Sequence, residues 1–224
     1  MTENTWIGVD DYFETLFTSK DKDLEAVLDA SAAAGMASQQ VTASQGKFLA
    51  ILAQSIGTKS ILEIGTLYGY STIWLGRTLP QDGKLISLEI DDQRARFARL
   101  NVERAGLEKV VEIRSGPALE TLSQLATEKH EPFDFVFVDA DKPNYRAYLH
   151  WVMKLTRRGS LIVADNIVRD GAVTHADSRD EKVLGVREFN SAVAEDRRLS
   201  AVGIQTVGAK GYDGFLVALV TGDK

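Results

Sequence analysis

The sequence predicts an α/β fold, in which a doubly wound, mostly parallel seven-stranded sheet has helices on both faces. Along most of the 224 residues, short apolar runs alternate with stretches of helical periodicity. Near-continuous apolar strands are typical of a parallel sheet, because right-handed crossover helices cover both of its faces. No linker, repeat or low-complexity stretch divides the chain. We therefore expect a single domain over residues 1–224, large enough to bury roughly 70% of its unfolded surface.

The N-terminal part of the domain, residues 1–56, is expected to be helical. From Asp10 to Ile56 the apolar residues recur at helical spacing. This periodicity predicts two or three amphipathic helices ahead of the first strand. Residues 57–224 then form the core that contains the sheet.

Strand-like runs and helical stretches alternate through the first part of this core. Each predicted helix follows one strand and precedes the next, which is the pattern of repeated βαβ units. The predicted strands are 60–64, 84–90, 110–114, 133–139 and 160–165, and the predicted helices are 71–79, 91–105, 117–128 and 144–156.

The pattern changes after Asn166. A polar stretch, Val168 to Gly185, precedes a helix that is expected near Val186 to Arg197. Two last strands, VGIQTV and GFLVALV, are joined by Gly208 to Gly214, a segment with three glycines. Glycines in such a segment fit a hairpin-like connection, so we expect a C-terminal antiparallel strand.

Composition and charge exclude several classes of partner. The net charge is -6, so no general basic field exists to attract nucleic acid or a membrane surface. No apolar run approaches the roughly 20 residues of a membrane span, and the N-terminus lacks the order of a signal peptide. The chain has no cysteine, which excludes disulfides and thiolate ligands and suits a reducing compartment. A cytoplasmic enzyme is therefore expected.

Two apolar runs end on oxygen-bearing side chains. The run FVFVD ends at Asp139, and the run LIVADN ends at Asp165 and Asn166. An acid after a buried strand often caps the next helix, so each of these residues alone is ambiguous. Together, at the carboxyl ends of two parallel strands, they predict a site for a hard divalent cation. Mg²⁺ fits best, and Ca²⁺ or Mn²⁺ would accept the same ligands.

A lysine follows the first of these acids closely. Lys142 lies three residues beyond Asp139, in VDADKPNY. A lysine in a surface segment is usually solvated, but its position here would place the ammonium beside the metal carboxylates. Such a lysine can have a lowered pKa and act as a base, or stay charged and stabilise an oxyanion.

The first strand leads into a turn with two glycines. Gly65 and Gly69 would let the backbone approach a ligand closely, and Glu89 at the end of the second strand can accept both hydroxyls of a ribose. The turn lacks the G-x-G-x-x-G order of a dinucleotide site. Each feature alone can be a tight turn or a helix cap, but their spacing in one βαβ unit indicates a nucleoside-bearing cofactor with little phosphate.

Several motifs, taken in order, resemble one enzyme family. Glu63-Ile-Gly-Thr…Gly-Tyr-Ser71, Ser87-Leu-Glu89, Gly116-Pro-Ala118, Phe137-Val-Asp-Ala-Asp-Lys-Pro-Asn-Tyr145 and Ala164-Asp-Asn166 look like the class I, divalent-metal- and S-adenosylmethionine-dependent O-methyltransferases, the group of catechol and caffeoyl-coenzyme A O-methyltransferases. The resemblance runs from about Val41 to the C-terminus. It implies a Rossmann-like methyltransferase fold and methyl transfer to a hydroxyl of a small catechol-like or phenolic acceptor.

The resemblance also implies a role for particular residues. It implies Lys142 and Asp139 as catalytic residues, and Asp139, Asp165 and Asn166 as the metal ligands. The residues implied to bind S-adenosylmethionine are Val41, Glu63, Gly65, Thr66, Ser71, Glu89, Ala118, Asp139 and Asp141. One departure from the family pattern is Tyr68, where bacterial relatives often carry glycine, and this bears on the shape of the pocket near the methionine end.

The same features help to weigh alternative functions and the assembly state. A nicotinamide-dependent oxidoreductase would need the phosphate-binding glycine turn, and a nucleic-acid methyltransferase would need a base pocket in place of VDADK. A non-catalytic S-adenosylmethionine-binding protein remains an alternative, which the retained metal ligands and Lys142 disfavour. The resemblance implies a homodimer, in keeping with the apolar N-terminal helices. Arg169, Asp170 and His175, in the polar stretch, are possible substrate contacts.

Overall fold

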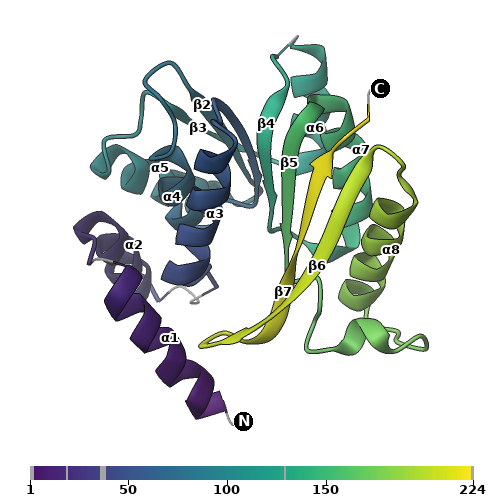
Figure 1. Cartoon of the computed structure of the whole chain (residues 1–224). Helices are drawn as coiled ribbons and strands as arrows, with labels where there is room; N and C mark the ends of the chain where they lie inside the picture. Colours follow the sequence, from purple (N-terminus) through teal and green to yellow (C-terminus); the bar gives the residue numbers. More distant parts are fainter. Residues whose placement is uncertain (1–2, 19, 36–38, 129, 223–224) are drawn as a thin grey trace. The chain divides into compact units, whose positions relative to one another are not determined.

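The computed structural model describes residues 3–18, 20–35, 39–128 and 130–222. The chain falls into two compact units, Met1–Ala118 and Leu119–Lys224, each with its own strands and helices (Figure 1). The described residues contain seven mostly parallel strands, eight α-helices and two short 3₁₀ helices. The predicted fold class is confirmed, including the antiparallel C-terminal strand.

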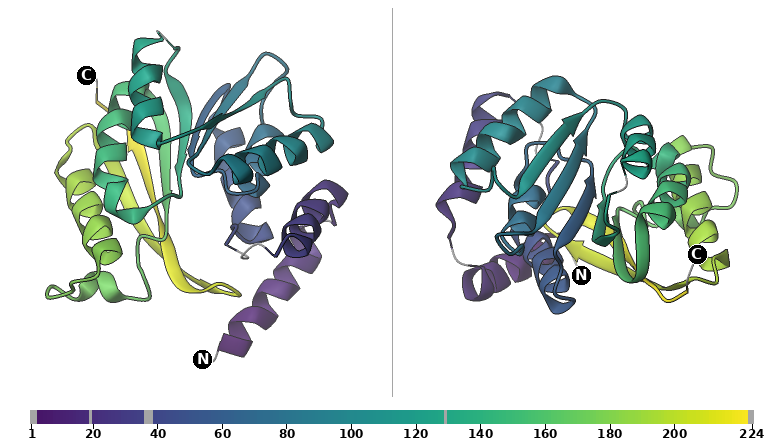
Figure 2. Two further views of the ribbon diagram at one scale, coloured as in Figure 1. Left: turned by 180° about the vertical axis from the view of Figure 1, so that it is seen from behind. Right: turned by 90° about the horizontal axis from the view of Figure 1, so that it is seen from above.

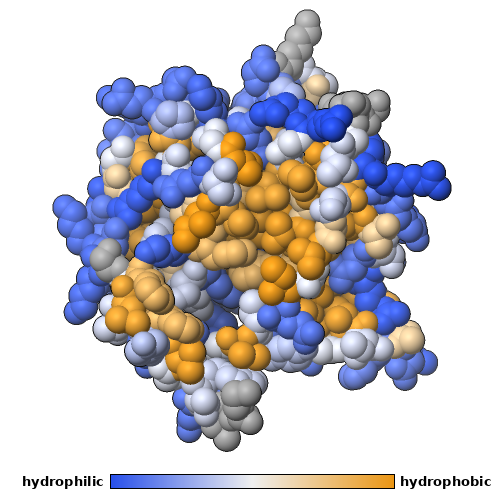
Figure 3. All heavy atoms as spheres, in the orientation of Figure 1, coloured by the Kyte–Doolittle hydropathy of each residue, from blue (hydrophilic) through white to orange (hydrophobic). Residues whose placement is uncertain are grey.

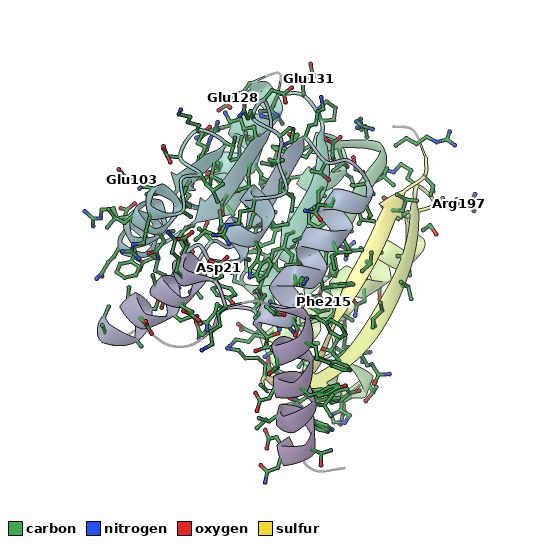
Figure 4. All side chains as sticks on the ribbon, turned by 60° about the vertical axis from the view of Figure 1, so that its left-hand side comes forward. Asp21, Glu103, Glu128, Glu131, Arg197 and Phe215 are labelled. Carbon is green, nitrogen blue, oxygen red and sulfur yellow. The ribbon has the colours of Figure 1, made fainter. Side chains whose placement is uncertain are left out.

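Three helices open the first unit, in agreement with the two or three that were predicted. They are α1 (Glu3–Phe17), α2 (Lys22–Ala33) and α3 (Ala43–Ser55). The side chain of Asp21, labelled in Figure 4, caps α2 by accepting hydrogen bonds from two backbone N–H groups, and it also pairs with Arg77. Thr42 and Gln45 form a reciprocal capping box at the start of α3. The helices therefore begin where capping side chains satisfy their free N–H groups.

The first unit contains three parallel strands in the order β3-β2-β1. Helices α4 and α5 connect them and pack against β2, and α5 also packs against β3. Nearly every side chain of β1 and β2 is buried, as the apolar runs predicted. The elements are β1 (Ser60–Ile64), α4 (Tyr70–Gly76), β2 (Lys84–Glu89), α5 (Asp92–Arg104) and β3 (Val111–Ser115).

The second unit has four strands in the order β4-β5-β7-β6. Strands β4 and β5 are parallel, and β7 is antiparallel to both β5 and β6. Helices α7 and α8 pack on each other and against these strands, and the view from behind in Figure 2 brings them in front of the strands. The elements are α6 (Ala118–Thr127), β4 (Phe133–Val138), η1 (Lys142–Asn144), α7 (Tyr145–Leu155), β5 (Thr156–Asp165), η2 (Ala172–Thr174), α8 (Glu181–Glu195), β6 (Leu199–Gly208) and β7 (Gly211–Val220).

The C-terminal part corrects two predicted boundaries. Helix α8 begins at Glu181, five residues before the expected Val186, because Asp180 caps it by accepting from Lys182 and Val183 N–H. The connection between the last strands is also shorter than Gly208 to Gly214. Gly211, at φ +88°, already completes the turn, and the residues after it continue the ladder with β6.

Two glycines allow segments of the second unit to approach closely. A Cβ at Gly185 of α8 would clash with the carbonyl oxygen of Lys142 in η1. A Cβ at Gly214 of β7 would clash with the carbonyl oxygen of Ile204 in β6. Helix α8 therefore packs directly on the backbone of the segment that follows β4, where Asp139 and Lys142 lie.

Apolar side chains gather on two surfaces. Helix α1 has no buried residue among those described and exposes six large apolar side chains, and β6 exposes three more. In Figure 3 orange surface lies over α1 and over the C-terminal strands. These exposed residues are Ile7, Val9, Tyr12, Phe13, Leu16 and Phe17 of α1, and Val202, Ile204 and Val207 of β6. None of the described helices has the length and apolar character that crossing a membrane requires.

Candidate active site

A buried carboxylate organises the end of β1 in the first unit. Glu63 has no exposed surface, and its two oxygens accept hydrogen bonds from three hydroxyl groups. Its Oε1 accepts from Ser71 at 2.6 Å, and its Oε2 accepts from Thr72 at 2.5 Å and Ser87 at 2.6 Å. Thr66 lies 2.5 Å from the Ser87 hydroxyl. The structure thus brings the predicted residues Glu63, Thr66 and Ser71 into one network, in which Glu63 ties the start of α4 to β2.

The turn after β1 uses left-handed backbone at three of its five residues. Gly65, Leu67 and Gly69 have φ values of 103°, 52° and 88°. Gly65 N–H donates to Leu88 O, and Leu67 N–H donates to a carboxylate oxygen of Glu89 at 2.8 Å. Left-handed backbone at a non-glycine residue costs about 1–3 kcal/mol and persists only where the surroundings enforce it. Glu89 supplies that enforcement and lies beside the glycine turn, as the spacing predicted.

Two further predicted cofactor residues of the first unit lie at the starts of helices. Val41 is buried just ahead of α3, and Ala118 is the first residue of α6. The departure from the family pattern, Tyr68, is 3% exposed and packs edge-on against Phe97 at 6.1 Å. Its ring therefore packs against α5 within the first unit.

The predicted metal residues meet at the carboxyl ends of β4 and β5. These strands are parallel neighbours with Val138 opposite Ala164, so Asp139 and Asp165 follow paired residues. Burial, and then the charge of Asp139, raise the pKa of Asp165 to about 8. Asp165 Oδ1 also accepts from Asn166 N–H at 2.7 Å, and Asn166 has a left-handed φ of 58°.

This arrangement fits a divalent cation. The described residues contain no cluster of three or more histidine, cysteine or acidic side chains with metal-binding geometry. The predicted ligands do not form such a cluster, because one of the three is an asparagine. They are two carboxylates and one amide, whose oxygens are ligands that Mg²⁺ accepts. Burial and the nearby Asp139 make ionisation of Asp165 costly, and a bound cation would offset that cost with positive charge.

Lys142 lies within this cluster and is not a solvated surface lysine. Its residue is 7% exposed, and its Nζ donates to Asp139 Oδ1 at 3.0 Å and to Tyr145 Oη at 2.6 Å. Burial raises the pKa of the Tyr145 hydroxyl well above its usual value of 10, and the nearby Asp139 and Asp165 carboxylates add to the rise. Sequence reasoning missed Tyr145, although its spacing of three residues from Lys142 on a helical turn was a usable signal.

The carboxylate of Asp141 turns toward α7. Its Oδ1 accepts from Tyr148 Oη at 2.5 Å, and its Oδ2 accepts from Asn144 Nδ2 at 2.5 Å. Burial, followed by the bond to Asp141, raises the pKa of Tyr148 well above its usual value. Asp141 therefore bonds to one residue of η1 and one of α7, which fixes the segment between Asp139 and α7.

The segment after Asn166 is held by a residue that sequence reasoning also missed. Arg169 and Asp170 both have φ values of 54°, and Asp213 Oδ1 accepts from Val168 N–H at 2.9 Å and Arg169 N–H at 3.0 Å. His175 is an exposed residue after η2. Nothing in the sequence pairs Asp213 with this segment, because the contact depends on how β7 lies along β5.

These features are typical of one enzyme class. The α/β fold has a glycine turn and a buried acid after its first strands, and a buried lysine beside acidic side chains after later ones. Comparison with known proteins agrees. Residues 17–217 match the family model described as O-methyltransferase. The chain belongs to this family and is an S-adenosylmethionine-dependent O-methyltransferase, so the oxidoreductase alternative is set aside.

The similar proteins match over nearly their whole length. The catechol O-methyltransferase of Niastella koreensis is 46% identical over 220 residues, which is 98% of this chain and all of the relative. The catechol O-methyltransferase of Mycobacterium tuberculosis is 45% identical, over 95% of this chain and 94% of the relative. The O-methyltransferase structure from Bacillus cereus, solved with SAH, is 49% identical with a TM-score of 0.97, covering 98% of this chain and 100% of that one.

A substitution at Glu63 tests the network after β1. Glu63→Gln replaces one acceptor oxygen with an NH₂ group that faces hydroxyl donors. We expect it to lower the free energy of unfolding by about 1–3 kcal/mol, the cost of leaving buried polar groups unpaired. Urea denaturation measures this change.

The matched control is Glu103→Gln, because Glu103 projects from the exposed side of α5 in Figure 4. It makes the same chemical change and should alter stability by less than about 0.5 kcal/mol. Equal effects of the two substitutions would show that the Glu63 network does not stabilise the turn.

Proposed function

We propose that this O-methyltransferase moves a methyl group from S-adenosylmethionine to one hydroxyl of a small catechol-like acceptor, assisted by a divalent cation. The observation that carries the proposal is the cluster after β4 and β5. There a buried acid whose pKa is raised to about 8 lies near a second acid and a buried lysine. Such a cluster suits a site that holds a cation and an ionised oxygen together.

Asp139, Asp165 and Asn166 would hold the cation. Mg²⁺ is preferred, since it takes a few protein oxygens and completes its shell with water or substrate oxygens. Ca²⁺ or Mn²⁺ would accept the same ligands. When bound, the ion supplies Lewis acidity, which lowers the pKa of a hydroxyl group and orients it.

Lys142 and Asp139 would act on the acceptor. A phenol has a pKa near 10, so little phenolate exists at neutral pH without help. Lys142 would take the proton of the attacking hydroxyl or stabilise the charge that remains, while Asp139 orients its Nζ across the 3.0 Å hydrogen bond. The methyl donor is already activated, so the main task of the protein is to align oxygen and carbon roughly 3–3.5 Å apart.

The proposed cofactor residues follow the first strands and β4. Glu89 would accept the ribose hydroxyls, and Gly65 would let the backbone approach the cofactor. Relatives support the choice of cofactor, because the Bacillus cereus enzyme was solved with SAH and TomG of Streptomyces achromogenes, 44% identical, with SAM. The remaining proposed cofactor residues are Val41, Glu63, Thr66, Ser71, Ala118, Asp139 and Asp141.

A catechol-like acceptor is proposed because of the relatives that match. Two catechol O-methyltransferases are 46% and 45% identical to this chain. A caffeoyl-CoA O-methyltransferase of Zea mays is 37% identical over 70% of this chain. Both names describe acceptors with neighbouring hydroxyl groups, which could bind one cation through two oxygens.

We also propose that the enzyme lies in the cytoplasm, because its cysteine-free chain suits a reducing compartment. We further propose that it is a homodimer. Helix α1 exposes Phe13 at 45% and Phe17 at 59%, with four further large apolar side chains. Burying such side chains against a second copy would remove apolar surface from water, which favours a dimer.

Turnover with and without the cation tests the proposed reaction. We expect methyl transfer from S-adenosylmethionine to a panel of catechols, including caffeic acid, to stop in chelator and to return when Mg²⁺ is restored. Mass spectrometry of the products measures the transfer. Transfer that continues in chelator would remove the cation from the mechanism. Cofactor binding without transfer to any acceptor would contradict the proposed acceptor class.

The affinity for Mg²⁺ should depend on pH. Because the pKa of Asp165 is raised to about 8 without a cation, a proton occupies this acid at pH 6.5 and competes with the metal. We expect affinity to rise as the pH increases toward 8 and to level off above it, with protons released on binding at the lower pH. Isothermal titration in buffers of different ionisation enthalpy measures both quantities.

Asp165→Asn removes the titrating group and should weaken binding and abolish its rise with pH. Asp177→Asn is the matched control, because Asp177 is an exposed aspartate of the same unit. A wild-type affinity that is independent of pH, or an Asp177→Asn variant that behaves like Asp165→Asn, would contradict the assignment.

The dimer can be tested through α1. Substituting Phe13→Glu and Phe17→Glu together should shift the protein to a monomer, because the charges would have to be desolvated at the interface. Light scattering after size-exclusion chromatography measures the mass. Asn4→Glu, at an exposed position of the same helix, should leave the mass unchanged. A wild-type monomer, or a dimer that persists in the double variant, would contradict an interface through α1.

A further inference from the structure

We propose that Tyr145 is a positioning residue for methyl transfer, whose hydroxyl holds the Lys142 ammonium at a fixed place relative to the ends of β4 and β5. The inference rests on the proposed function, since it assigns how the proposed catalytic lysine is kept in place. Asp139 also bonds to the lysine, but Tyr145 was given no role in the sequence analysis.

The Tyr145 hydroxyl joins three groups. Its Oη lies 2.6 Å from Lys142 Nζ, 3.2 Å from the carbonyl oxygen of Val138 and 3.1 Å from that of Asp165. A hydroxyl has one proton to donate and two lone pairs to accept with. The proton is therefore directed at the two carbonyls, and a lone pair accepts from the lysine.

The two carbonyls belong to the ends of both strands that lead into the proposed metal ligands. Val138 is the last residue of β4, and Asp165 is the last residue of β5. The backbone of a strand within a sheet moves little, so an oxygen bonded to both strand ends is a fixed reference point. The lysine is thereby placed relative to the strands and not only relative to Asp139.

Lys142 is fixed along its whole length. Its carbonyl oxygen lies against Gly185 of α8, where any Cβ would clash, and its Nζ lies 4.6 Å from the centre of the Tyr145 ring. An ammonium has three donors. One is directed to Asp139 and one to Tyr145. Among the described residues these are its hydrogen bonds, so the third N–H could donate to an oxygen of the acceptor.

The Tyr145 ring cannot move away from this place. It is fully buried, packs edge-on against Phe189 at 5.4 Å, and lies 6.3 Å from the Tyr148 ring. A phenylalanine would fill the same volume and keep the contact between the ring and Lys142. Only the hydroxyl bonds would be lost, which makes Tyr145→Phe a sharp test of their role.

The neighbouring tyrosine provides a contrast. The Tyr148 hydroxyl bonds to Asp141 at 2.5 Å, whereas the bonds of the Tyr145 hydroxyl run to Lys142 and the strand ends. Tyr148→Phe therefore removes the same atom from the same helix without freeing the lysine. The inference predicts a larger loss of kcat for Tyr145→Phe than for Tyr148→Phe.

The experiment measures kcat and KM with Mg²⁺ and a catechol acceptor. Tyr145→Phe should lower kcat on the order of 10²-fold, the cost of misplacing a reacting group by about 1 Å. The KM for S-adenosylmethionine and the affinity for Mg²⁺ should change little, because neither ligand set loses a group. A wild-type kcat in Tyr145→Phe would overturn the inference. Thermal unfolding and cofactor binding confirm that the variant is folded.

A double-mutant cycle separates positioning from general damage. If Tyr145 acts through Lys142, Tyr145→Phe should lower kcat no further in a Lys142→Ala background. An additional loss equal to that of the single substitution would overturn the inference. Lys142→Arg provides a test that leaves Tyr145 intact. It keeps the charge but not the position, so it should lose activity nearly as Lys142→Ala does, and wild-type turnover would count against positioning.

The cycle also distinguishes the two proposals. If Lys142→Ala keeps wild-type turnover, the catalytic role of the lysine fails, and the positioning role fails with it. If Lys142→Ala loses turnover while Tyr145→Phe keeps it, only the positioning role fails.

Discussion

The need to satisfy carboxylates that are buried at the ends of apolar strands is the constraint on which this protein depends. A buried ionised carboxylate is costly unless hydrogen bonds or opposite charge compensate it. Glu63 is compensated within the protein by three hydroxyl donors. Asp165 is compensated less well, because burial and then the charge of Asp139 raise its pKa to about 8. The first arrangement stabilises the turn after β1, and the second is where we propose that a cation binds.

The backbone around the second site is held in costly conformations by partners from other elements. Asn166, Arg169 and Asp170 all have positive φ values, at a cost of about 1–3 kcal/mol each. The Asp213 carboxylate and the bond from Ile167 N–H to Gly214 O hold the segment to β7. The antiparallel strand β7, which lies between β5 and β6, therefore helps to set the position of a proposed metal ligand and of the segment after it.

In the second unit, the fold brings the acid, lysine and tyrosine of one sequence motif into contact. The motif VDADKPNY places an acid, a lysine and a tyrosine at intervals of three residues. In the structure the 3₁₀ turn η1 and the start of α7 bring all three onto one side, where lysine bonds to both partners. Helix α8 completes the arrangement, because Gly185 lets it pack on the lysine backbone and Phe189 packs on the tyrosine ring.

The sequence by itself determined the strands, the connecting helices and the pairing of Asp139 with Asp165 across two strand ends. Periodicity and burial are local and repeat along the chain, so β1, β2 and β4 begin and end within a residue of their predicted bounds. The start of α8 was missed although Asp180 is a standard capping residue, because the polar stretch before it has no periodicity.

Only the tertiary structure decided which distant residues form hydrogen bonds with one another. Glu63 binds hydroxyls from α4 and β2, Tyr145 binds the ends of β4 and β5, and Asp213 binds the turn after β5. These partners lie up to 45 residues apart in the chain. Hydrogen bonds need atoms within about 3 Å of each other, and only the register of the strands and the packing of the helices bring such distant residues that close.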